Sequence, residues 1–102
     1  QGSNANPTCR VAQVILPSAV YAEKDGTFTN AQGRVQRIRP AVSPLGEAKG
    51  DWQILSALGK RVGVSLPFAD SRTVFEDLAA HEPAFKSLSY EVIGDQGMLL
   101  KE

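Results

Sequence analysis

Residues 14–36 read VILPSAVYAEKDGTFTNAQGRVQ, and this stretch decides the fold of the first half of the chain. It begins inside an apolar run, Val11–Leu16, which is rich in strand-forming residues and stops at Pro17. A strand that is apolar at almost every position is typical of a parallel sheet covered on both faces. We therefore expect Val11–Leu16 to be a central buried strand, which Pro17 ends because proline cannot donate to the ladder.

The second part of the same stretch predicts a β-hairpin. Thr27–Thr29 and Arg34–Ile38 are short strand-like segments, and Asn30–Gly33 between them is rich in turn residues. Gly33 can adopt the positive φ that such a turn requires. We expect the two segments to pair across this loop.

Downstream, the spacing of apolar residues predicts a helix over Trp52–Val62. Asp51 is a good N-cap, and Gly63 follows the basic last turn, as expected for a helix end. Trp52 is the only tryptophan of the chain. We expect it to be a buried core anchor, with a role at an interface as the alternative.

Three further elements are expected near the C-terminus. A second helix begins after Asp70 or Ser71 and ends at Pro83. Tyr90–Ile93 has the residue types of a short strand, and Gly94–Glu102 has the composition of a tail. The pattern as a whole predicts a small mixed α/β fragment.

Composition limits the classes of function. The 102 residues suit a single domain, and eleven basic residues balance eleven acidic ones. This balance argues against a nucleic-acid or anionic-membrane surface, which needs a basic excess, and no stretch is apolar enough to insert into a bilayer. Gln1–Ala5 resembles the remnant of an expression tag, so residues 6–102 are taken as the folded part.

Residues 14–36, followed by PLGEAKGDWQIL at residues 44–55, resemble a segment of the molybdopterin oxidoreductase superfamily. In that superfamily a strand ending in Leu-Pro precedes Glu-Lys, a Gly-Thr-Phe-Thr-Asn turn and Gly-Arg-Val-Gln. The similarity of Leu58–Phe68 favours one branch, the large iron–sulfur subunit of NADH-quinone oxidoreductase, or respiratory complex I. The chain would then be a C-terminal fragment of that subunit, cut from a larger doubly wound domain.

This resemblance implies a scaffold without catalytic residues. The large iron–sulfur subunit relays electrons from NADH towards quinone through iron–sulfur clusters, and their cysteine motifs would lie outside this fragment. We expect no cofactor or metal in the fragment itself. Its expected partners are the rest of that subunit and the other subunits of the peripheral arm, on the cytoplasmic side of the bacterial inner membrane.

The alternative is the same segment of a molybdenum- or tungsten-dependent formate dehydrogenase, which would help to bind a pterin. Backbone N–H groups and a guanidinium could then contact the pterin phosphate. The candidate residues of this alternative are Gly26, Thr27, Asn30, Gly33 and Arg34.

Other reactive side chains have simpler interpretations. Glu23, Lys24 and Asp25 could perform acid–base chemistry, but we favour a solvated turn with local ion pairing, because exposed charge clusters are common. Cys9 is the only cysteine and is expected to be passive, because one thiol cannot hold an iron–sulfur cluster. His81 is expected to cap a helix end or to face solvent.

The buried-type strand predicts association of the isolated chain. If Val11–Leu16 lacks neighbours, its unpaired backbone groups would seek another strand. We expect it to pair with the same strand of a second molecule, giving a homodimer, or with a strand from the chain's own C-terminal region.

Overall fold

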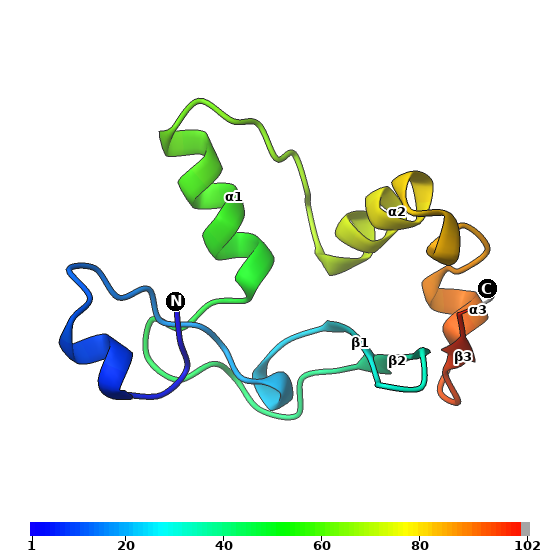
Figure 1. The fold of residues 1–102 in the computed structure, drawn as a ribbon, viewed down its shortest axis with the longest axis horizontal. Helices are drawn as coiled ribbons and strands as arrows, with labels where there is room; N and C mark the ends of the chain where they lie inside the picture. The colour runs from blue at the N-terminus through cyan, green and yellow to red at the C-terminus, as the bar shows by residue number, and fades with distance from the viewer. Residues whose placement is uncertain (101–102) are drawn as a thin grey trace. The chain divides into compact units, whose positions relative to one another are not determined.

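The computed structural model describes residues 1–100, and they form two compact units. Unit 1 comprises Gln1–Lys24 and Pro40–Leu66, and the described part of unit 2 comprises Asp25–Arg39 and residues 67–100. Figure 1 shows the elements along the chain. Their bounds are η1 Pro7–Arg10, η2 Tyr21–Glu23, β1 Gly26–Thr29, β2 Arg34–Ile38, α1 Asp51–Arg61, α2 Ser71–His81, η3 Pro83–Phe85, α3 Tyr90–Ile93 and β3 Met98–Leu99. The expected small mixed α/β fragment is confirmed.

Unit 2 is built on a three-stranded antiparallel sheet with the order β1-β2-β3. The predicted hairpin is confirmed: Thr27 pairs with Arg37, and Thr29 pairs with Val35. The expected tail is wrong in one respect, because Met98–Leu99 adds a third strand along β2. An antiparallel neighbour satisfies the second edge of β2, and a tail at this position would have left that edge open.

The helix α2 begins and ends where the sequence predicts. Asp70 is its N-cap and accepts a hydrogen bond from the backbone N–H of Thr73 at 2.8 Å. The predicted strand at Tyr90–Ile93 is wrong, since these residues form the short helix α3. Ser89 caps this helix by accepting from the N–H of Val92, and the cap outweighs the strand preference of the residues that follow.

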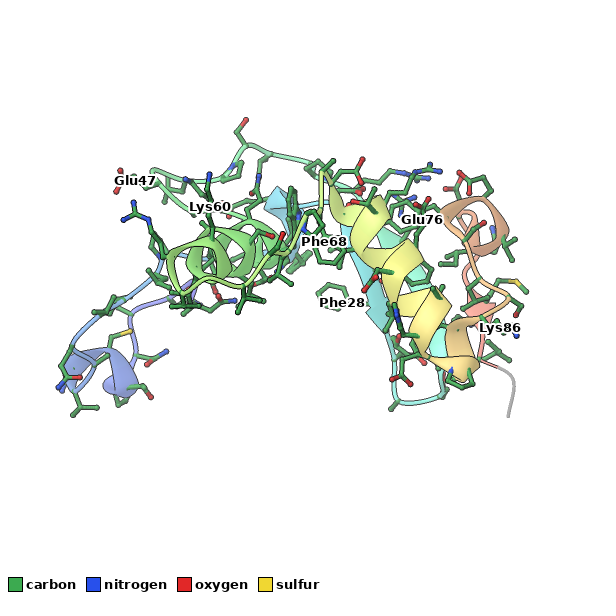
Figure 2. All side chains as sticks on the ribbon, turned by 90° about the horizontal axis from the view of Figure 1, so that it is seen from above. Phe28, Glu47, Lys60, Phe68, Glu76 and Lys86 are labelled. Atoms are coloured by element: carbon green, nitrogen blue, oxygen red, sulfur yellow. The ribbon has the colours of Figure 1, made fainter. Side chains whose placement is uncertain are left out.

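The hydrophobic core of unit 2 lies between the sheet and its helices. Val35 and Ile93 are almost completely buried at its centre. Phe75 of α2 contacts the ring of Phe85 edge-on at 6.1 Å and the ring of Tyr90 at 5.5 Å. Charged residues such as Glu76 and Lys86 lie on the outside of this unit (Figure 2). Sheet and helices therefore share one aromatic core, which fixes α3 against β2.

Unit 1 contains α1 and few buried apolar side chains. The predicted helix is confirmed, but its N-cap is Gly50 rather than Asp51. Gln53 accepts from the N–H of Gly50 at 3.0 Å and so completes the first turn. The expectation that Trp52 is a buried anchor is wrong: its side chain is half-buried, and Ile54 is the buried apolar residue of α1.

The expected central strand Val11–Leu16 is not observed. Val11 is 81% exposed and Val14 is 75% exposed, and the backbone there makes a turn after η1. A strand of this kind needs neighbours on both sides, whereas the nearby pairing within residues 1–100 is limited to isolated bridges at Pro17 and Ser18. Because Val11–Leu16 forms no strand, it offers no strand edge with which a second molecule could pair.

The third strand depends on a close approach at Gly97. This residue has φ of +72°, and a Cβ atom there would lie 2.7 Å from the carbonyl oxygen of Val35. Gly46 has φ of +57° but open space around it. A substitution at Gly46 therefore introduces backbone strain without steric overlap, which makes it the comparison for Gly97.

We expect Gly97→Ala to lower the free energy of unfolding by about 2–4 kcal/mol, because strain and overlap add. Gly46→Ala should cost about 1 kcal/mol from strain alone. Urea denaturation of both variants measures the difference. Equal losses would show that the packing of β3 on β2 does not constrain residue 97.

Candidate functional site

The five candidate cofactor residues lie at the two ends of the hairpin. Asn30, Gly33 and Arg34 gather at the turn that joins β1 to β2. Gly26 and Thr27 lie at the other end of β1, where they pair with Ile38 and Arg37. The structure therefore brings three of the five together and separates the other two from them.

The backbone N–H donors of the turn already form hydrogen bonds within the turn. The side-chain oxygen of Asn30 accepts from the N–H groups of Gln32 at 2.9 Å and Arg34 at 3.0 Å. The N–H of Gly33, at φ of +76°, donates to the carbonyl of Asn30 at 3.0 Å. A phosphate would have to replace these bonds, so the backbone of the turn is a poor anion site in this conformation.

The guanidinium of Arg34 has more N–H donors than its contacts within residues 1–100 use. One terminal nitrogen of its guanidinium donates to the carbonyls of Gln96 at 3.4 Å and Gly97 at 3.3 Å. A guanidinium carries five N–H donors in a planar fork, so the same side chain can hold the β3 loop and still bind an anionic group. Of the residues at the turn, Arg34 therefore fits a phosphate best.

In unit 1, Asp51 joins the start of α1 to the segment before the hairpin. Its carboxylate accepts from the Ser18 hydroxyl at 2.8 Å and forms an ion pair with Lys24. Partial burial acts to raise the pKa of Asp51, but hydrogen bonds from Lys24 and Ser18 outweigh it, so the pKa lies below its ordinary value. These contacts connect the start of α1 to Ser18 and Lys24, so the role of Asp51 is structural.

A second polar group lies in unit 2, and we call Asp25, Arg37, Ser71, Arg72 and Tyr90 the Tyr90 cluster. Asp25 binds the Arg37 guanidinium at 2.7 Å and accepts from the hydroxyl of Ser71. Arg37 stacks on the Tyr90 ring at 3.4 Å from its centroid, and Arg72 lies over the same ring at 5.4 Å. The cluster connects the hairpin, α2 and α3 through cation–π and ionic contacts.

Two polar atoms of this cluster are buried without a hydrogen-bond partner among residues 1–100, namely Nε of Arg37 and the hydroxyl of Tyr90. Burial raises the pKa of the Tyr90 phenol, and the nearby Ser71 hydroxyl only partly offsets this effect. Sequence reasoning missed this cluster, because residue types predict a strand at Tyr90 and no local motif links Arg37 to its partners.

The remaining candidates have structural roles. Lys24 and Asp25 do form ion pairs, but the expected local pairing at the turn is wrong, because their partners are Asp51 and Arg37. Glu23 accepts from the backbone N–H of Val20 at 3.0 Å. His81 is exposed at the end of α2, with Nδ1 2.8 Å from the Asp77 carbonyl oxygen.

Metal-ligating side chains are scattered over the described residues. Within residues 1–100, no three His, Cys, Asp or Glu side chains gather as a metal site. None of the helices in that range has the length and apolarity to cross a bilayer.

Comparison with known proteins identifies the family. A family model described as molybdopterin oxidoreductase matches residues 1–61, more than half of the chain. The chain therefore belongs to the molybdopterin oxidoreductase family. The match includes Gln1–Ala5, so the tag interpretation stays a prediction that only the composition of those residues supports.

Its curated relatives include formate dehydrogenases. The F420-dependent formate dehydrogenase 2 subunit alpha of Methanococcus maripaludis is 42% identical over 93 residues, covering 89% of this chain and 14% of the relative. The putative formate dehydrogenase YrhE of Bacillus subtilis is 41% identical over 86 residues, covering 84% of this chain and 9% of the relative. The F420-dependent formate dehydrogenase subunit alpha of Methanocaldococcus jannaschii is 39% identical over 93 residues, covering 89% of this chain and 14% of the relative. The chain thus spans about one-seventh or less of these relatives.

The lowered pKa of Asp51 predicts a pH-dependent contribution to stability. A carboxylate with a lowered pKa stabilises the fold above its unfolded pKa, and this contribution is lost as the pH falls through the folded pKa. Asp51→Asn should therefore cost at most about 1 kcal/mol at pH 7, because the side chain is 40% exposed. The cost should shrink as the pH falls below the unfolded pKa of an aspartate, about 3.9, and vanish once Asp51 is protonated in the folded state. Urea denaturation from pH 7 into this acid range tests this, with Asp95→Asn in an exposed ion pair as control. A cost that persists in acid would contradict the electrostatic origin.

The unpartnered hydroxyl of Tyr90 leads to a second expectation. Tyr90→Phe keeps the ring under Arg37 and removes a buried oxygen without a partner. The free energy of unfolding should stay constant or rise by about 1 kcal/mol. Tyr90→Leu should cost about 2 kcal/mol or more, because it removes the stacked ring from the core. If thermal and urea unfolding show that Tyr90→Phe destabilises as strongly as Tyr90→Leu, the hydroxyl has a bonding role.

Proposed function

We propose that this chain is a segment of a formate dehydrogenase-like subunit and contributes to its pterin-binding part. The observation that carries this proposal is the identity of 39–42% to formate dehydrogenases over more than four-fifths of the chain. These relatives favour formate dehydrogenase over the large iron–sulfur subunit of complex I.

In this proposal Arg34 is the residue that holds an anionic group of the pterin. Its guanidinium is partly occupied by the carbonyls of Gln96 and Gly97, which fix its position, and its other N–H groups bond no further residue within 1–100. The pterin with its metal would supply the redox chemistry, in which formate loses an electron pair and a proton to give carbon dioxide. In this proposal the role of the chain is to bind the pterin and to orient it.

The large iron–sulfur subunit of complex I is the second candidate, and it rests on the resemblance of Leu58–Phe68. In that case the chain is scaffold, and iron–sulfur clusters elsewhere in the subunit carry the electrons. Its partners would be the rest of that subunit and the peripheral-arm subunits, on the cytoplasmic side of the inner membrane. The two candidates differ in whether the whole subunit holds a pterin.

The test uses the full-length subunit that carries this segment, purified without oxygen. We expect molybdenum or tungsten and a pterin to copurify, together with formate-dependent reduction of a viologen dye. A subunit with iron–sulfur clusters but no pterin would overturn the proposal in favour of the scaffold.

Arg34→Ala in that subunit should lower its pterin content. Arg39→Ala is the matched control, because Arg39 lies just beyond β2 and forms an exposed ion pair with Asp95. Equal pterin content in both variants would remove Arg34 from the binding site.

A further inference from the structure

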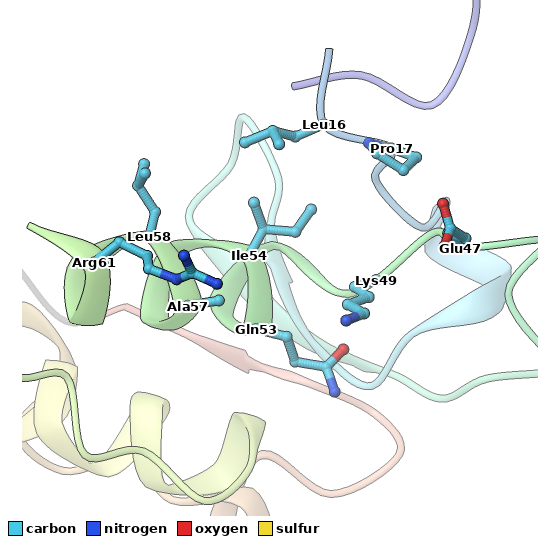
Figure 3. A pocket seen from close by; sticks show the side chains of 9 residues that line it. All are labelled: Leu16, Pro17, Glu47, Lys49, Gln53, Ile54, Ala57, Leu58 and Arg61. Carbon is cyan, nitrogen blue, oxygen red and sulfur yellow. The ribbon is translucent and has the colours of Figure 1, made fainter. Parts of the chain in front are cut away.

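A groove of about 470 Å³ runs along α1 in unit 1, and the segment before the hairpin forms its other wall (Figure 3). Ile54 and Leu58 line its apolar middle, and Glu47 and Lys49 place opposite charges at one end. This mixture of charges favours neither an anionic nor a cationic partner, so the groove does not indicate an occupant. The Tyr90 cluster of unit 2 is more specific, because it contains a peptide bond with a defined chemical reactivity.

The reactive peptide bond joins Asp25 to Gly26, and no other Asp or Asn of the chain is followed by glycine. The backbone nitrogen of the next residue can attack the side-chain carboxyl carbon, Cγ, of an aspartate. A carbon–nitrogen bond forms, one carboxyl oxygen leaves as water, and the product is a five-membered succinimide ring. Glycine favours this step because it has no Cβ atom to shield its nitrogen, and the space around Gly26 is open.

Water then opens the succinimide ring at one of its two carbonyl carbons. Opening at the side-chain carbon restores aspartate, whereas opening at the main-chain carbon leaves isoaspartate, in which the chain continues through Cβ and Cγ. The water released by ring closure is taken up again by ring opening, so the overall change is an isomerisation without any co-reactant. Isoaspartate has one more methylene group in the main chain, and its carboxylate lies in a different place.

The structure holds both carboxylate oxygens of Asp25. Oδ1 accepts from the Arg37 guanidinium at 2.7 Å, and Oδ2 accepts from the hydroxyl of Ser71. Because ring closure expels one of these oxygens, it cannot occur while both contacts persist. Gly26 is also the first residue of β1 and pairs with Ile38, which restrains the attacking nitrogen. Closure therefore requires local opening of the cluster.

Isoaspartate at residue 25 would not preserve these contacts. The extra methylene group would lie directly before β1 and displace the carboxylate from Arg37 and Ser71. The Arg37 side chain is only 11% exposed, so it would keep a charge that is largely removed from water and has lost its partner. Isomerisation would therefore break the connection between the hairpin and α2.

We propose that Asp25 is a site of spontaneous isomerisation, which its contacts with Arg37 and Ser71 suppress in the folded chain. These contacts then have two roles: they stabilise unit 2, and they keep its main chain chemically intact. The proposal does not depend on the redox function, because no cofactor takes part.

Incubation of the whole chain for several weeks at physiological temperature and pH tests the proposal. Mass spectrometry of fragment ions measures isoaspartate at residue 25, and a synthetic peptide of residues 22–28 gives the rate without the fold. The folded chain should react at least about tenfold more slowly than the peptide, because local opening must precede ring closure. In urea concentrated enough to unfold the chain, the two rates should agree.

Ser71→Ala frees one carboxylate oxygen and leaves the ion pair of Asp25 with Arg37. It should speed isomerisation at residue 25 about three- to tenfold, the effect expected from loss of one hydrogen bond. Ser71→Thr keeps the hydroxyl and should stay slow. Ser87→Ala is the matched control, because Ser87 is an exposed serine of the same unit. Urea denaturation of each variant checks that it is folded during the incubation.

Three results would overturn the proposal. A folded chain that reacts as fast as the peptide would show that the contacts of Asp25 give no protection. Equal rates for Ser71→Ala and Ser87→Ala would show that the bond from Ser71 does not restrain the carboxylate. A peptide without isoaspartate would show that the Asp25–Gly26 bond is not reactive.

Discussion

The contact of Asp25 with Arg37 and of Arg37 with Tyr90 is the interaction on which unit 2 depends. Asp25 lies just before β1, Arg37 lies on β2, and Tyr90 begins α3. The Arg37 side chain is only 11% exposed, so its charge needs a partner close by. Asp25 supplies that partner, and the Tyr90 ring covers one face of the guanidinium. Burial of one arginine thereby fixes the hairpin and α3 as parts of the same core.

Features with a local physical cause could be predicted from the sequence. The turn at Asn30–Gly33 follows from the side-chain cap of Asn30 and the positive φ of Gly33, both of which are properties of neighbouring residues. The bounds of α2 likewise follow from the cap of Asp70 and the proline after its last turn. Caps and turns act over a few residues, so they survive whatever the distant chain does.

Features that depend on distant residues could not be predicted. The apolar run Val11–Leu16 predicts a strand only if neighbouring strands are present, and residues 1–100 provide none beside it. Tyr90–Ile93 prefers a strand by residue type, and the helix there combines the local cap of Ser89 with burial of Ile93 in the core that Val35 shares. Arg34 is a candidate from the sequence, whereas the pairing of Arg37 with Asp25 requires the hairpin register. Candidate sites thus follow from motifs, and their contacts from the fold.

The sheet of unit 2 has short outer strands, with four residues in β1 and two in β3. An incoming strand could form only a few backbone hydrogen bonds with either edge before the ladder ended. Fibril growth requires many such bonds in register, repeated from molecule to molecule. The brevity of these strands therefore protects the folded chain against amyloid-type aggregation, even though Phe28 and Leu99 are about half exposed on them.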